Sequence, residues 1–129
     1  MLQQFIFHFC FVVVGCGDSF HVLPGSFKRL QSPLYPHDFN HGVLCIWKFS
    51  TNDTHSLIIH IRDLDLGPDN ANCVQNYILI ETRTIKKKFC STNITDIRLE
   101  SSEVKVLFKS GMGSTGKGYS MDVKSVGKI

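Results

Sequence analysis

Cysteine is the residue type with the plainest chemistry in this 129-residue chain, which contains five of them. Cys10 lies within an apolar N-terminal run, and the remaining four are Cys16, Cys45, Cys73 and Cys90. If the apolar run is removed during secretion, Cys10 leaves with it and an even number remains. An even set behind a secretion signal is typical of disulfides formed in an oxidising compartment. We therefore expect two disulfides, for which the sequence alone permits three pairings.

The other patterns that could support catalysis, cofactor binding or metal binding are weak. Residues 111–118 match the G-x-G-x-x-G spelling, but a phosphate loop must open a helix, and the residues that follow alternate like a strand. We expect this segment to be a flexible hairpin. His37 and His41 would need a further ligand to hold zinc, and the cysteines are already committed. With no G-x-S-x-G motif and no free cysteine nucleophile, we expect neither enzymatic activity nor a cofactor.

The elements that must position these residues are short strands. Apolar and polar side chains alternate in five segments bounded by turn-forming residues, which are 45–49, 56–61, 77–82, 104–109 and 119–126. No stretch keeps a helical period. Recurring strands with turns between them favour a β-sandwich or barrel, and the chain length suits one domain.

The first fifteen residues differ from the rest in composition. An apolar run from Phe5 to Val14 contains no Lys or Arg. A bilayer needs about 20 apolar residues, so this shorter run suits a secretion signal better than a membrane span. We expect a signal over 1–15, one domain over 16–126 and a short tail over 127–129. The alternatives are a buried first strand or helix, and a lipobox at 13–16 with an acylated Cys16, which would leave an odd number of cysteines.

The charge of the chain is mildly basic, with a net charge of +3 and a pI near 8.6. This is too weak a balance to indicate a nucleic-acid partner. The basic residues most able to form a patch for a sulfated glycan or an acidic protein are Arg83, Lys86, Lys87, Lys88, Lys105, Lys109 and Lys117. The interpretation that we favour is that 86–88 is a solvated turn and that folding scatters these charges. Two glycosylation sequons, at Asn52 and Asn93, fit a secreted protein.

The order of motifs along the chain resembles the CUB domain family. The motifs are Cys16, Ser32-Pro33-Leu34-Tyr35-Pro36, Cys45-Ile46-Trp47, a hydrophobic strand from Leu57 to Ile61, Cys73, a strand starting at Tyr77, Cys90, Val104 to Phe108, and Gly116-Lys117-Gly118-Tyr119. The resemblance covers Cys16 to about Val126. It implies a jelly-roll-like sandwich of two antiparallel sheets, with Cys16–Cys45 and Cys73–Cys90 disulfides. It also implies that Trp47 and Phe49 pack between the sheets, and that Pro33 and Pro36 rigidify a surface loop.

Many domains of this family bind calcium through carboxylates from three loops. The resemblance places those positions at residues that have no carboxylate. The family's acidic positions fall at Gly67, Asn76 and Gly111, and a tyrosine often found near the site falls at Phe39. Calcium takes six to eight oxygen ligands, and charged oxygens supply most of the affinity. We therefore expect no tight calcium site, although Asp63, Asp65 and Asp69 lie nearby in sequence.

The resemblance implies an extracellular recognition module without catalysis of its own. Our leading hypothesis is a secreted single-domain binder of a protein or glycan, similar in scale to the spermadhesins, with no membrane span and an oligomeric state left open. The second hypothesis is that the chain is an N-terminal module, as a fragment or short isoform, of a larger extracellular protease or receptor. A third is matrix adhesion through self-association.

Overall fold

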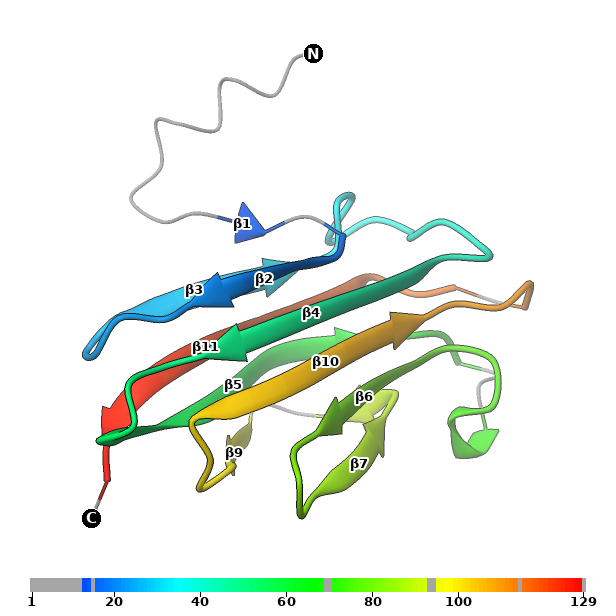
Figure 1. Ribbon diagram of the computed structural model, residues 1–129. Helices are drawn as coiled ribbons and strands as arrows, with labels where there is room; N and C mark the ends of the chain where they lie inside the picture. The colour runs from blue at the N-terminus through cyan, green and yellow to red at the C-terminus, as the bar shows by residue number, and fades with distance from the viewer. Residues whose placement is uncertain (1–12, 15, 69–70, 93–94, 114, 129) are drawn as a thin grey trace.

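The computed structural model describes residues 13–14, 16–68, 71–92, 95–113 and 115–128, and these form two stacked β-sheets (Figure 1). One sheet, here called the β11 sheet, has the order β1 (Val13–Val14), β3 (Phe27–Gln31), β11 (Gly118–Gly127), β5 (His55–Asp65) and β8 (Ser91–Thr92), with β9 (Thr95–Arg98) also paired to β5. The other, the β10 sheet, has the order β2 (Asp18–His21), β4 (Leu44–Ser50), β10 (Glu103–Lys109), β6 (Tyr77–Glu81) and β7 (Lys86–Phe89). A short 3-10 turn, η2 (Ala71–Cys73), precedes β6. The expected all-β sandwich with two disulfides is confirmed; its pairings are antiparallel except β1–β3 and β2–β4.

The core forms because alternate residues of facing strands point between the sheets. Buried and exposed side chains alternate along β4 and along β10 with the period of two that a strand imposes. Trp47 and Phe49 are each 1% exposed, which confirms that they are core residues. Tyr119 of β11 meets them from the opposite sheet, with its ring centroid 6.1 Å from that of Trp47. Aromatic side chains such as these bury more apolar area than any others.

The two disulfides have the pairing that the family resemblance implies. Cys16–Cys45 attaches the segment before β2 to β4, and Cys73–Cys90 attaches η2 to the residue that follows β7. The paired residues are 29 and 17 positions apart in the chain, respectively. Each bridge therefore closes a loop whose two ends lie in or beside the β10 sheet.

Two local expectations are wrong. Residues 111–118 are not a hairpin, because β10 and β11 belong to different sheets and the glycine-rich segment crosses from one to the other. Residues 86–88 are not a solvated turn, because they lie within β7, which pairs antiparallel with β6. A local pattern shows neither which sheet a strand joins nor which strand it pairs with.

The N-terminal segment is described only at its end. Val13 and Val14 form β1, which pairs parallel with Arg29 and Leu30 of β3. The rest of the expected signal, 1–12 and 15, lies outside the described residues. In the described part of the chain, no helix has the length and apolar character needed to cross a membrane.

Candidate functional site

Asn76 connects three segments at one end of the sandwich. It precedes β6 and is 1% exposed. Its Nδ2 donates a hydrogen bond to the carbonyl oxygen of Leu66, 2.8 Å away, after the end of β5. Its Oδ1 accepts one from the backbone N–H of Gly111, also at 2.8 Å, after the end of β10. One neutral amide thus joins segments from both sheets.

Ser110 fixes the neighbouring loop in a similar way. Its hydroxyl donates to the carbonyl oxygen of Asn40 at 2.8 Å and accepts from the N–H of Val43 at 2.9 Å. Phe39 is buried in the same loop and packs edge-on against Phe108, with ring centroids 5.5 Å apart. The loop from 39 to 43 is therefore held to β10 by an aromatic contact and by hydrogen bonds to a neutral side chain.

The three positions at which the family carries its calcium-binding carboxylates do not fit a calcium ion. Asn76 is the only one with an oxygen-bearing side chain, and its Oδ1 already accepts from Gly111. A Cβ added at Gly111 would lie 2.4 Å from Oε1 of Gln75 and 3.1 Å from its carbonyl oxygen, so an aspartate there would require Gln75 to shift. Within the described ranges, no three His, Cys, Asp or Glu side chains come together to hold a metal. Calcium needs several anionic oxygens, and these three positions supply one neutral amide oxygen.

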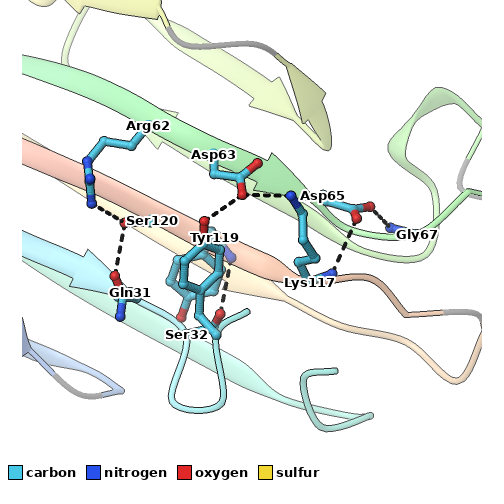
Figure 2. A network of polar contacts seen from close by, with 10 residues as sticks. Gln31, Ser32, Arg62, Asp63, Asp65, Gly67, Lys117, Tyr119 and Ser120 are labelled. Carbon is cyan, nitrogen blue, oxygen red and sulfur yellow. Dashed lines mark hydrogen bonds and ion pairs between the residues drawn. The ribbon is translucent and has the colours of Figure 1, made fainter. Parts of the chain in front are cut away.

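Asp63 and Asp65, near the end of β5, are engaged by other groups (Figure 2). Asp63 Oδ2 accepts a hydrogen bond from the Tyr35 hydroxyl at 2.5 Å and lies 3.0 Å from Nζ of Lys117. Asp65 accepts from the backbone N–H groups of Gly67 and Lys117, at 3.3 and 3.4 Å. These contacts attach the Pro33–Pro36 loop and the glycine-rich crossing to β5. Asp69, the third aspartate of this stretch, lies outside the described residues.

The electrostatics of Asp63 follow from this arrangement. Burial alone would raise its pKa, but the hydrogen bond from Tyr35 and the ammonium of Lys117 together hold the pKa of Asp63 below its usual value. The same hydrogen bond, with burial, raises the pKa of Tyr35, and the ion pair raises the pKa of Lys117. Lys117 is thus a partner of Asp63 beside the β11 sheet, and it does not belong to the patch expected from sequence.

Four of the seven basic residues expected to form a patch lie on one face. Strand pairing places Lys86 opposite Glu81, Glu81 opposite Lys105, and Lys105 opposite Lys48. Directly opposed residues on neighbouring strands point to the same side of a sheet. Lys88 and Lys109 occupy alternate positions on the same strands and point the same way. We call Lys48, Lys86, Lys88, Lys105 and Lys109 the lysine face; it covers the outer side of the β10 sheet.

The remaining members of the expected patch lie elsewhere. Lys87 pairs with the buried residue Ile80, so it points to the core side of the edge strand β7. Arg83 is exposed in the turn between β6 and β7 and lines an open hollow of about 1030 Å³. Lys48 was not expected in the patch. Its alternation with the core residues Trp47 and Phe49 in an expected strand was the available signal, but the sequence did not show that β4 pairs with β10.

The other sequence candidates are placed as follows. Asn52 is exposed after β4, and its Oδ1 lies 3.0 Å from Nε2 of His21. Asn93 lies outside the described residues. Nε2 of His41 is 3.0 Å from the carbonyl oxygen of Gly113, and His37 is exposed. Nothing in the described ranges brings a third metal ligand to this pair of histidines.

Comparison with known proteins gives a consistent result. The family model of the CUB domain matches residues 16–122. Rat discoidin, CUB and LCCL domain-containing protein 2 is 30% identical over 81% of this chain and 14% of its own length. Bone morphogenetic protein 1 of Xenopus laevis is 26% identical over 81% of this chain and 15% of its own, and the Drosophila melanogaster cubilin homolog is 21% identical over 92% and 3%. The chain therefore spans 15% or less of the length of these curated relatives.

Solved structures show the same fold. The full extracellular region of zebrafish Gpr126/Adgrg6 superposes with a TM-score of 0.78 at 23% identity, over 89% of this chain and 15% of that one. The MASP-1 CUB2 domain bound to Ca²⁺ superposes with a TM-score of 0.68 at 18% identity, over 84% of this chain and 99% of that one. At these identities the likeness concerns the fold alone.

Proposed function

Because this chain belongs to the CUB domain family, whose members are generally non-catalytic extracellular interaction modules, we propose that it is a secreted module that recognises a protein or glycan partner without a calcium ion. The domain spans residues 16–126, after a signal over 1–15 that is cleaved behind Gly15. The mature chain then has four cysteines, all of which are paired in the structure.

The observation that carries the calcium-free part of the proposal is the position of Asn76. A bound calcium would fix the loops by attracting carboxylates from several segments. Here the neutral Asn76 amide links Leu66 and Gly111 directly. The loops at this end of the sandwich can therefore keep their arrangement when calcium is absent, and partner binding should not depend on it.

Thermal unfolding in calcium and in EDTA tests this part of the proposal. Extracellular calcium modules have dissociation constants of about 0.1–1 mM, so about 10 mM calcium would stabilise such a site by about 1.4–2.7 kcal/mol. That corresponds to a shift in melting temperature of several degrees for a domain of this size. We expect no shift. The MASP-1 CUB2 domain, whose solved structure holds Ca²⁺, is the positive control. A calcium-dependent shift of similar size in this chain would contradict the proposal.

The binding part needs a separate experiment. The secreted chain is immobilised and exposed to an array of purified extracellular proteins and glycans, once in calcium and once in EDTA. We expect at least one saturable partner that is retained in EDTA. Loss of that partner in EDTA, with the chain still folded, would show that recognition needs calcium. No saturable partner in either buffer would contradict a role as a binding module.

A second candidate function is supported by the lengths of the relatives. In each of the curated relatives compared, the matched region is a small part of a much longer protein. The chain would then position an enzyme or signalling unit encoded with it. Sequencing of the full transcript distinguishes the two: coding that continues past Ile129 favours the module of a larger protein, and a stop there favours the single-domain binder.

A further inference from the structure

The lysine face surrounds a row of apolar side chains. Ile46 is paired with Leu107, and Leu107 with Leu79, so the three point outward side by side across the β10 sheet. We call them the apolar strip. Ile46 is 38% exposed, and the other two are half-buried. Lys88 continues the row on β7, because it pairs with Leu79.

Rows that carry lysine lie on both sides of the apolar strip. One row contains Lys48, Lys105, Glu81 and Lys86, and the other contains Lys109 between Leu44 and Tyr77. Successive outward residues of a strand are about 7 Å apart, so a partner on the strip would reach ammonium groups on either side. The strip and its flanks therefore form one amphipathic surface.

The lysines of this face are not explained by protection of a sheet edge. Lysine on an edge strand discourages pairing with other chains, and this reading suits Lys86 and Lys88 on β7. Lys48 lies on β4, however, and Lys105 and Lys109 lie on β10. Both strands are paired on each side within the β10 sheet. Lysine there protects no open edge, and the apolar residues between the lysines gain nothing from exposure to water.

The charges of the lysine face are mostly uncompensated. Its five lysines face two glutamates, Glu81 and Glu103, at outward positions of the same strands. Lys105 pairs with Glu81 at 3.5 Å, and Nζ of Lys88 lies 4.3 Å from the ring centroid of Tyr77. Lys48, Lys86 and Lys109 have no carboxylate within ion-pair distance among the residues that the structure describes.

We infer that the outer face of the β10 sheet is the docking surface of the module, and that its occupant is an acidic polypeptide segment that also presents apolar side chains. The inference rests on the proposed function and names its surface and class of partner. Carboxylates of the segment pair with the flanking lysines, and its apolar side chains cover Ile46, Leu79 and Leu107. Complementary charge speeds and orients the encounter, and apolar contact removes water from the strip.

A polypeptide fits this surface better than a sulfated glycan. A glycan would satisfy the lysines, but its sugar rings pack best on exposed aromatic faces. The aromatic side chain on this face, Tyr77, is half-buried and has the ammonium of Lys88 over its ring. The aliphatic strip matches leucine or valine side chains, and a polypeptide can carry these together with carboxylates in one short segment.

The open hollow of about 1030 Å³ adjoins the lysine face and extends the surface. It is lined by Lys48, Glu81 and Lys105 of the lysine-bearing row and by residues of β2 and of the neighbouring turns, and its charged lining residues outside that row are Asp53, Arg83, Glu103 and Lys128. A folded partner could place its acidic segment on the strip and a neighbouring loop in the hollow.

The experiment measures binding of a short synthetic peptide in which glutamate and leucine alternate, by fluorescence anisotropy at low and at physiological salt. The comparison probes are a glutamate-only peptide of equal charge and a heparin oligosaccharide. We expect the alternating peptide to bind most tightly and to weaken with salt. Lys48→Glu and Lys109→Glu should each weaken it about tenfold. Ile46→Thr should weaken it about fivefold and leave the glutamate-only peptide unaffected.

The matched control is Lys87→Glu. It makes the same charge change on β7 but on the core side of the strand, so we expect less than a twofold effect. An equal loss with this variant would mean nonspecific attraction and would overturn the inference. Tighter binding of heparin, dependent on the lysines but not on Ile46, would assign the face to a glycan instead. All variants are first checked for an unchanged melting temperature.

Failure here is distinguishable from failure of the proposed function. If no probe binds, the docking surface is wrong. The calcium experiment and the partner array would still test the proposed function independently. If the array yields a partner whose binding is insensitive to Lys48→Glu and Lys109→Glu, the module binds through another face.

Discussion

Asn76 is the residue on which the loop end of the sandwich most depends. Its side chain makes hydrogen bonds to a carbonyl and to an N–H group that come from different segments. Asn76→Leu would remove both hydrogen bonds, so the buried Leu66 carbonyl and the Gly111 N–H would lose the Asn76 side chain as a partner. We expect the free energy of unfolding, measured with urea, to fall by about 2–4 kcal/mol.

Asn40→Ala is the control for Asn76→Leu. Asn40 is exposed, and it accepts the hydrogen bond from Ser110 through its backbone carbonyl, which alanine keeps. We expect a change within about 0.5 kcal/mol. Equal effects of the two substitutions would mean that the amide of Asn76 does not hold the loops.

Tyr35 stabilises the fold through a charged acceptor, so its contribution should depend on pH. Its hydroxyl donates to Asp63, whose pKa in the folded state lies below the ordinary value of 3.8. A lowered pKa gives stability that is present above pH 3.8 and is lost as the pH falls through the folded value. Tyr35→Phe should cost about 1.5–3 kcal/mol at pH 7, and the cost should shrink below pH 4. Urea unfolding of the wild-type chain and of Tyr35→Phe, from pH 7 to below pH 4, measures this cost. A cost that does not change with pH would contradict the prediction.

At the scale of elements, the Cys73–Cys90 bridge holds η2 to the end of β7. It closes a loop of 17 positions, for which the chain-entropy estimate of stabilisation is about 3 kcal/mol. Replacing both cysteines with alanine should lower the free energy of unfolding by about that amount. The Cys16–Cys45 bridge closes a loop of 29 positions, so replacing both of its cysteines with alanine should lower the free energy of unfolding slightly more. Unfolding with urea under non-reducing conditions measures both, and a larger loss for the shorter loop would contradict the entropic account.

The five strands expected from sequence are present as β4, β5, β6, β10 and β11, with ends that differ by a few residues. They could be predicted because each has an apolar side that faces the core and a polar side that faces water, which imposes a period of two. β2, β3, β7, β8 and β9 were missed. β7 consists of three lysines and a phenylalanine, and β2 has a single apolar residue, so neither shows an alternation that propensity can detect. Their strand form comes from pairing with β6 and β4.

The candidate surfaces could be predicted only in part, because they too depend on which strands and loops lie next to one another. The sequence marked Gly67, Asn76 and Gly111 as poor calcium ligands, but the two hydrogen bonds of Asn76 depend on loops from both sheets. From the sequence, seven basic residues could be grouped only by their charge. Register decides which of them share a face: it brings in Lys48 and turns Lys87 to the core side. Lys117 is removed from the group by Asp63, on a strand of the other sheet.

At the scale of the whole molecule, the proposed cleavage after Gly15 would fix where the mature chain begins. We expect protein purified from the medium of eukaryotic cells to begin at Cys16 and to carry a glycan at Asn52. Intact mass after deglycosylation measures the N-terminus, and reduction should then add about 4 Da for two disulfides. Asn52→Gln is the control for the glycan. A mature N-terminus upstream of Val13, or an unchanged mass on reduction, would contradict the proposed processing.

The same cleavage would alter one sheet, because β1 lies before the cut. Without Val13 and Val14, the side of β3 that pairs with β1 becomes an open edge, while Cys16 stays tied to Cys45. Backbone amides on an open edge exchange with solvent without breaking a sheet hydrogen bond. At Arg29 and Leu30, the backbone N–H that points toward β1 should lose its protection. We therefore expect it to exchange much faster in the mature protein than in refolded protein that retains residues 1–15. Amides of β10, paired on both sides, should exchange equally slowly in the two forms. Equal protection of β3 in both forms, measured by nuclear magnetic resonance, would mean that β1 adds nothing to this sheet.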